Sequence, residues 1–168
     1  MSKRFLILFF PLFLFSGCTV SYKLNGASID YTRVKTISIE DIPIQATLVY
    51  SPFSRTFTEG LKDQFAHNSK LHLVKKEGDL QIDGEITGYD LTPMAQQANG
   101  YAAETKLTVT VNIRFVNTTK TDENFEEKFT AYRTFPATSM LEDVQDALLA
   151  EITTEISESI FNKAVANW

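Results

Sequence analysis

The segment LTVTVNIRF, residues 107–115, decides the fold of this chain. Apolar residues at the odd positions alternate without a break with polar residues at the even ones. Side chains of a strand point alternately to its two faces, so this period of two predicts a strand that is buried on one face only. The protein is therefore expected to build a sheet with one covered face and one polar face.

The neighbouring segments extend this sheet in both directions. Residues 80–86 and 125–135 alternate in the same way, and shorter strands are expected at 34–39 and 71–75. The alternation changes phase at Tyr89 to Leu91, which predicts a β-bulge there. Gly84 and Gly88 fall on the expected apolar face, where they would leave room for a helix packed above. Residues 92–104 are expected to form a loop or a loosely paired hairpin tip, and residues 117–124 a polar turn.

Two helices are expected on either side of these strands. Ser51-Pro52 is typical of a helix start, with Ser51 as the cap, and the helix should run to about His67. Ser139 and Glu142 form a capping box that opens a second helix reaching nearly to Trp168. The expected buried stripes are Phe53, Phe57, Leu61 and Phe65 in the first helix, and Leu141, Val144, Leu148, Ile152, Ile156, Ile160 and Ala164 in the second.

This order of elements predicts an α+β fold. We expect a two-layer sandwich, in which a mainly antiparallel or mixed sheet of about four to five strands carries both helices on one face. Phe57, Phe65, Leu148 and Ile156 should pack against the 107–115 strand.

The N-terminus has the pattern of a lipoprotein signal peptide. Lys3 and Arg4 precede an apolar run over residues 5–15, which is too short to span a membrane as a helix. Phe15-Ser16-Gly17-Cys18 then reads as a lipobox, although Phe15 stands where Leu is usual. We expect cleavage after residue 17, diacylglyceryl attachment to the Cys18 thiol and acylation of its amine. The alternative is an ordinary secretion signal followed by an unrelated buried cysteine.

Residues 18–168 are expected to form a single domain, because about 150 residues suffice for one core. Cys18 is the only cysteine, so no intramolecular disulfide is possible. Without Lys3 and Arg4, 14 basic residues face 21 acidic ones, which argues against a nucleic-acid partner. His67 and His72 have no metal-ligand spacing, and no nucleophile elbow is present. We therefore expect neither an enzyme, nor a metal site, nor a cofactor.

Several segments together resemble the LptE family of lipopolysaccharide-assembly lipoproteins, in its Bacteroidetes form. They are the lipobox and the stretches SPFSRTFTEGLKDQF (51–65), GDLQIDGEITGY (78–89), LTPMA (91–95), TVTVNIRF (108–115) and AVANW (164–168). The resemblance covers nearly the whole chain and implies a small sandwich of two helices on a sheet.

The resemblance also implies a function. A member of this family would be an outer-membrane lipoprotein that plugs the lumen of the LptD β-barrel, helps it to fold and assists delivery of lipopolysaccharide to the outer leaflet. Cys18 would be the lipid attachment site. Candidate contacts to the barrel or to lipopolysaccharide are Lys106, Arg114, Lys128 and Arg133, which lie on neighbouring strands. The alternative role for each of these four is cross-strand pairing with Glu126 or Glu127.

Two other functions remain open at this point. The protein could be an accessory lipoprotein of another periplasmic or outer-membrane transport system, in which case its partner would be soluble. It could also be a lipid-anchored hydrolase, which would need a buried cluster of titratable groups that the sequence does not contain.

Overall fold

A computed structural model describes residues 29–48, 50–94 and 103–166. Cys18 and the signal segment lie outside the described residues. The described elements are, in chain order, β1 (Thr36–Ile39), α1 (Ser51–Asn68), β2 (His72–Val74), β3 (Leu80–Met94), β4 (Glu104–Asn117), β5 (Phe125–Pro136) and α2 (Leu141–Phe161). A 3-10 turn (Thr121–Glu123) precedes β5, and a π-helical turn (Asn162–Ala166) continues α2.

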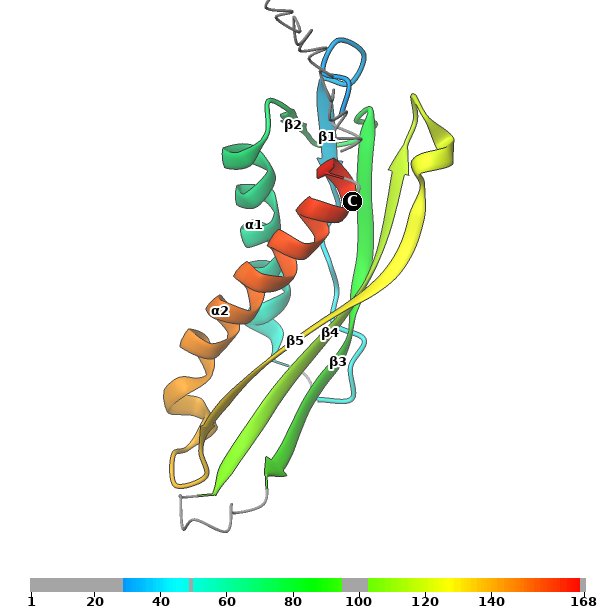
Figure 1. Ribbon diagram of the computed structural model, residues 1–168. Coiled ribbons are helices and arrows are strands. Elements are labelled where there is room, and N and C mark those ends of the chain that lie inside the picture. Colours follow the sequence, from blue (N-terminus) through cyan, green and yellow to red (C-terminus); the bar gives the residue numbers. More distant parts are fainter. Residues whose placement is uncertain (1–28, 49, 95–102, 167–168) are drawn as a thin grey trace, which may run out of the picture.

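The strands form one mixed sheet in the order β2-β1-β3-β4-β5. β1 is parallel to both of its neighbours, whereas β3, β4 and β5 form an antiparallel meander. Both helices pack on the same face of this sheet (Figure 1). The structure thus confirms the predicted α+β sandwich. Among the described residues, neither helix is long and apolar enough to cross a membrane.

The link between β2 and β3 is unusually short for a connection between strands with the same direction. Residues 75–79 cross β1 at Ser38, where a Cβ on Gly78 would lie only 2.5 Å from Ser38 N. Glu77 adopts a left-handed conformation with φ 56° to make this turn. Asp79 then accepts hydrogen bonds from the backbone N–H groups of Lys35 and Thr36, at 2.8 and 3.0 Å. The link therefore fixes the start of β1.

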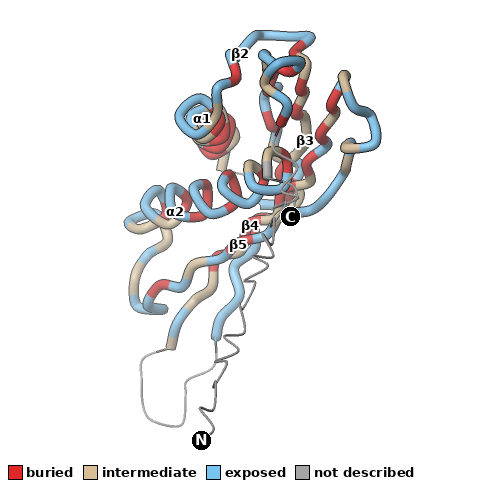
Figure 2. Tube along the Cα trace, turned by 45° about the horizontal axis from the view of Figure 1, so that its top comes forward, coloured by how far each residue is buried: buried red, intermediate tan, exposed pale blue. Residues whose placement is uncertain are grey.

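The core lies between the helices and the odd-numbered residues of β4 (Figure 2). All four apolar residues predicted for the α1 stripe are buried, as is Ile156 of α2. Leu148 and Val144, both predicted for the α2 stripe, pack against the core but are only half-buried, and Leu149 is the buried residue at this point of α2. α2 is rotated toward α1 as well as toward the sheet, and the rings of Phe161 and Phe65 meet at 5.1 Å.

Both predicted helix caps are wrong. The N-cap residue of α1 is Tyr50 and that of α2 is Met140, and neither makes a side-chain capping bond. Ser51 is already helical, while Ser139 belongs to the turn after β5 and donates its backbone N–H to Pro136 O. The helices therefore depend on packing rather than on caps.

The bulge in β3 lies two residues before the predicted range, Tyr89 to Leu91. The register with β4 shifts between Ile86 and Gly88, so Thr87 is the extra residue. The prediction that Gly84 and Gly88 share the apolar face is therefore wrong. Gly84 lies on the buried face, where a Cβ would collide with Asn112 O. Gly88 pairs with Thr110 on the polar face. The predicted 92–104 loop is also too long, because β3 continues to Met94 and pairs with Glu104. Residues 95–102 lie outside the described part.

Candidate functional site

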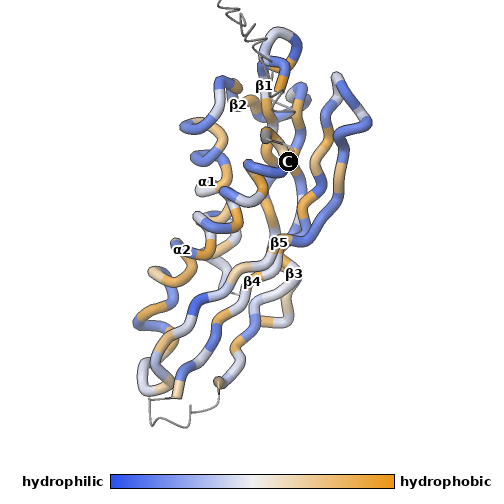
Figure 3. Tube along the Cα trace, in the orientation of Figure 1, coloured by the Kyte–Doolittle hydropathy of each residue, from blue (hydrophilic) through white to orange (hydrophobic). Residues whose placement is uncertain are grey.

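The face of the sheet that carries no helix is a polar surface built by the regular strands β3, β4 and β5. Hydrophobic and hydrophilic residues alternate along β3, β4 and β5 (Figure 3). The buried members of this alternation belong to the core under the helices, and the polar members share the other face of the sheet. We call this surface the helix-free face. Its residues on the last two strands of the meander are Lys106, Thr108, Thr110, Asn112 and Arg114 of β4, and Glu126, Lys128, Thr130, Tyr132 and Thr134 of β5.

Arg114 lies on the helix-free face and forms its strongest ion pair. Its register neighbours are Asp83 on β3 and Glu126 on β5. The guanidinium donates from Nε to Asp83 Oδ1 at 3.0 Å and from Nη2 to Oδ2 at 2.9 Å, a bidentate geometry that raises the pKa of Arg114. Asn112 donates to Glu126 at 2.9 Å. Arg114 therefore has a cross-strand partner, and that partner is Asp83 rather than Glu126.

Lys106 and Lys128 lie on the same face, and neither pairs with a carboxylate in the part of the chain that the structure describes. The Lys106 amine is 5.5 Å from the centre of the Tyr132 ring, which is 57% exposed. Lys128 stands opposite Asn112, and no ion pair to it is present among the described residues. We call these two amines the free cations of the helix-free face, because within the described parts of β4 and β5 they are the cations on that face that make no ion pair.

Arg133 lies on the opposite side of the sheet. Its register partner is the buried Leu107, so its side chain points toward α2. It donates to Glu151 at 2.7 Å and to Glu155 at 2.6 Å, and these two bonds raise its pKa. Arg133 Nη1 also donates a hydrogen bond to the backbone carbonyl oxygen of Tyr132, at 2.8 Å. The structure thus brings together three of the four predicted basic residues and separates Arg133, which ties β5 to α2.

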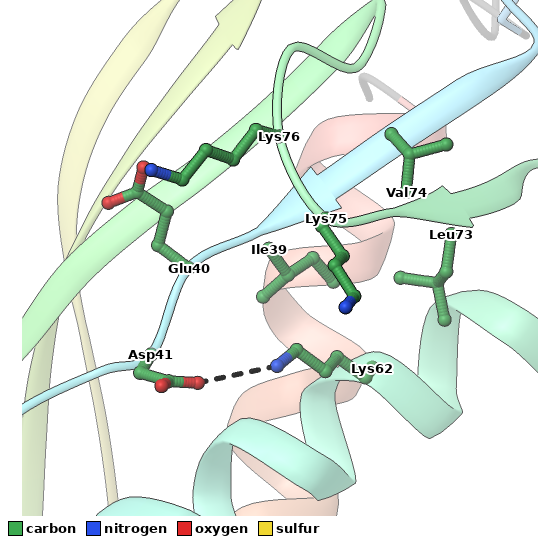
Figure 4. A pocket seen from close by; sticks show the side chains of 8 residues that line it. All are labelled: Ile39, Glu40, Asp41, Lys62, Leu73, Val74, Lys75 and Lys76. Atoms are coloured by element: carbon green, nitrogen blue, oxygen red, sulfur yellow. Dashed lines mark hydrogen bonds and ion pairs between the residues drawn. The ribbon is translucent and has the colours of Figure 1, made fainter.

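A second basic cluster was not expected to be a site. A cleft of about 490 Å³ opens between α1 and the carboxyl ends of the parallel strands β1 and β2 (Figure 4). It is lined by Ile39, Glu40, Asp41, Lys62, Leu73, Val74, Lys75 and Lys76. In the sequence, Lys75 and Lys76 indicate only a turn. Lys75 lies near Lys62, whereas Lys76 points toward Glu40 (Figure 4). The proximity of Lys75 to Lys62 depends on the parallel placement of β2 beside β1, which alternation alone does not reveal.

The described residues contain no group of three or more His, Cys, Asp or Glu side chains that could hold a metal ion. His67 is exposed and its Nδ1 lies 2.9 Å from Asp63 O in the preceding helical turn. His72 is exposed on the edge strand.

Comparison with known proteins agrees with this architecture. The model of the family described as "LptE: Lipopolysaccharide-assembly" matches residues 34–164. No curated protein matches the sequence significantly.

Solved structures of bacterial lipoproteins have the same fold. A minor lipoprotein from Acinetobacter baumannii is 18% identical, with a TM-score of 0.51 over 80% of this chain and 95% of that one. Rare lipoprotein B from Shewanella oneidensis is 12% identical, with a TM-score of 0.52 over 77% of this chain and 95% of that one. Because the family model covers most of the sequence, the chain belongs to the LptE family of lipopolysaccharide-assembly proteins.

Proposed function

We propose that this chain is an outer-membrane lipoprotein that plugs the lumen of an LptD β-barrel, assists assembly of the barrel and helps to insert lipopolysaccharide into the outer leaflet. Residues 1–17 would be its signal peptide. Residues 18–168 would be the mature single domain, anchored by acylation of Cys18. Membership of the LptE family supports the role in lipopolysaccharide assembly, in which the family is not enzymatic.

The helix-free face is the observation that carries the barrel partnership. At about 3.4 Å per residue, the fourteen residues of β4 extend for about 45 Å. The apolar band of an outer-membrane barrel is about 25 Å tall, and its interior is polar. A face of threonines, amides and paired charges as long as β4 can therefore line such an interior from end to end.

The free cations on this face are the proposed contacts for the barrel or for lipopolysaccharide. Lys106 and Lys128 have no carboxylate partner among the described residues, so binding of an acidic group would break no existing ion pair. Arg114 is 60% exposed and could contact a second acidic group while it holds Asp83. Arg133 is the weakest of the four candidates, because Glu151 and Glu155 already occupy its guanidinium.

The test is an affinity pull-down of the lipidated protein from detergent-solubilised outer membrane. Mass spectrometry of what stays bound in high salt should find a large β-barrel in stoichiometric amount. Recovery of only soluble periplasmic or inner-membrane components would overturn the proposal and favour an accessory lipoprotein of another transport system.

Photo-crosslinking then tests which face is used. A photoreactive residue at Thr110, in the middle of the helix-free face, should crosslink to the barrel. The same residue at Thr154, on the exposed side of α2, is the matched control and should crosslink far less. Equal crosslinking from both positions would mean that the helix-free face is not the contact surface.

A further inference from the structure

The outer edge of β5 is not paired with any strand of the described chain. β5 is the last strand of the sheet, and α2 covers one face of it (Figure 1). The backbone N–H of Ala137 donates to Ala103 O at 2.9 Å, and the register between β4 and β5 is unbroken. Because opposite residues in an antiparallel pair are alternately bonded and non-bonded, the odd-numbered residues of β5 direct their N–H and C=O groups to β4. The even-numbered residues direct theirs outward.

A hydrogen bond at Tyr132 shows that the outward backbone groups are accessible. Tyr132 is even-numbered, and its carbonyl oxygen accepts a hydrogen bond from Arg133 Nη1 at 2.8 Å. The Arg133 guanidinium therefore reaches the open edge while its other bonds hold Glu151 and Glu155. Lys128 and Thr130, the preceding even-numbered residues, are exposed. An unpaired strand edge of this kind is a template on which another strand can pair.

An acidic cleft of about 340 Å³ lies between β5 and the exposed side of α2. It is lined by Arg133, Glu151, Thr154, Glu155 and Glu158. Arg133 pairs with Glu151 and Glu155, whereas Glu158 takes part in no ion pair within the described residues. α2 itself contains no lysine or arginine from Leu141 to Phe161. A strand added to β5 would direct every second side chain toward this cleft, where a cation is favoured.

A second copy of this chain is a poor partner for the open edge. Antiparallel pairing of two β5 edges would place both α2 helices on the same face of the joint sheet. The carboxylates of Glu151, Glu155 and Glu158 would then approach their counterparts in the other copy, and such juxtaposition of like charges is costly. The charge of the cleft therefore favours a different polypeptide that carries cations.

We propose that the outer edge of β5 binds an extended basic segment of another protein by β-strand addition. The segment would run antiparallel to β5, and its backbone would pair with the outward groups of Lys128, Thr130 and Tyr132. One of its N–H groups would replace Arg133 Nη1 at Tyr132 O. A lysine or arginine on the α2 side would form a charge-assisted hydrogen bond with Glu158. The proposal does not depend on the LptD partnership, which the pull-down tests separately.

The experiment titrates the full-length protein, in non-ionic detergent, into a short fluorescent peptide in which lysine alternates with threonine. Fluorescence anisotropy should show saturable binding, at least about tenfold tighter than that of the same peptide with glutamate in place of lysine. Lysines on the α2 side would place the threonines opposite the even-numbered residues of β5, so that the threonine amides face β5. Methylation of the threonine nitrogens should therefore weaken binding at least about tenfold, and methylation of the lysine nitrogens should weaken it far less. No saturable binding, or any other pattern with the methylated peptides, would overturn the proposal.

Variants of the protein locate the binding edge. Thr130→Pro removes an outward N–H without removing a bond to β4, and it should weaken binding of the lysine peptide at least about fivefold. Thr130→Val is the matched control, because it keeps the N–H and loses the same Oγ1 contact with Thr110. Circular dichroism will verify that each variant folds.

A second pair of variants tests the cleft without changing the backbone. Glu158→Gln should weaken binding of the lysine peptide at least about threefold. Glu142→Gln, which removes an exposed carboxylate of α2 outside the cleft, should leave binding unchanged. Unchanged binding in Glu158→Gln, or in a folded Thr130→Pro, would refute the assignment. A dimer of the protein alone that Thr130→Pro abolishes in analytical ultracentrifugation would assign the edge to a second copy and overturn the proposal.

Discussion

Gly60 of α1 and Thr153 of α2 lie so close together that a Cβ on Gly60 would be 2.5 Å from Thr153 Cγ2. Thr153 is buried and belongs to the stiff β-branched residues, so its methyl group has little room to move. The contact between the two helices therefore depends on the absence of a side chain at position 60.

Gly60→Ala is accordingly expected to lower the free energy of unfolding by about 1–3 kcal/mol, although alanine is the better helix former by about 1 kcal/mol. Adding Thr153→Ser removes the Cγ2 methyl and should recover most of the loss. Urea titrations of the wild type, both single variants and the double variant measure the coupling between the two sites. Additive effects would show that the close approach is not the cause.

Gly78→Ala should be more damaging. Its Cβ would lie 2.5–2.8 Å from three backbone atoms, Ser38 N, Leu80 O and Ile37 C, none of which can move without breaking the sheet. We expect a loss of about 3 kcal/mol or more, visible in thermal or urea unfolding. The neighbouring change Glu77→Gly is the control. It should raise stability by up to about 1 kcal/mol, because Glu77 has a positive φ that suits glycine.

Asp79 should make stability depend on acidic pH. Hydrogen bonds from the backbone of Lys35 and Thr36 hold the pKa of this carboxyl below its ordinary value. Because the folded pKa is lower than the unfolded one, ionised Asp79 contributes its full stabilisation above about pH 4, where the carboxyl of the unfolded chain is also ionised. This contribution to the free energy of unfolding is lost as the pH falls through the folded pKa. Asp79→Ala should cost about 1–2 kcal/mol at pH 7 and much less at pH 3. A difference between variant and wild type that stays constant from pH 7 to pH 3 would contradict this.

Tyr89 should make the free energy of unfolding fall as the pH rises into the alkaline range. Its side chain is buried, and burial raises its pKa to about 12, with a smaller contribution from the nearby Tyr50 and Asp146. The folded state therefore favours the neutral phenol, and its stability is complete below pH 10 and lost between about pH 10 and 12. Relative to Tyr89→Phe, the wild type should lose about 2 kcal/mol over that window. Urea titrations of both proteins at pH 9 and pH 11.5 check this, and parallel losses would exclude Tyr89 as the source.

Exchanging the charges of Asp83 and Arg114 tests whether Arg114 acts through its ion pair with Asp83 or through a direct contact with the proposed barrel. Arg114→Asp alone sets two carboxylates opposite each other and should cost about 1 kcal/mol of stability. Asp83→Arg with Arg114→Asp should restore the stability. If the double variant also retains the barrel in the pull-down, Arg114 acts through its ion pair with Asp83. If retention of the barrel stays low, the cation at position 114 contacts the barrel directly.

The meander was predictable because its signal is local. The alternation in 107–115 depends only on which residues face the core, and the structure extends the strand to Glu104–Asn117. The Phe53 to Phe65 stripe is equally local. The position of the bulge was harder to predict, because the break at Tyr89 to Leu91 is only the downstream effect of an extra residue at Thr87.

The features that depend on tertiary placement were missed. Leu148 and Leu149 are adjacent apolar residues, and only the contact of α2 with α1 decides which of them is buried. The parallel pairing of β1 and β2 joins residues about 36 positions apart, and no pattern within either strand indicates it. The cleft between α1 and the ends of β1 and β2 exists because of that pairing. The ion pairs of Arg133 exist because α2 packs on β5.

The placement of β1 between two parallel neighbours also constrains the order of folding. Its partners in β3 lie 43 positions away in the chain, whereas each strand of the meander pairs with the next along the chain. Contacts between near neighbours in sequence form faster, so the meander should assemble first and β1 should enter last, with the link over Ser38 closing behind it. Until then the upstream edge of β3 stays open to pairing with other chains. We therefore expect the protein to need a chaperone most before β1 enters the sheet, and the proposed function would place that step in the periplasm.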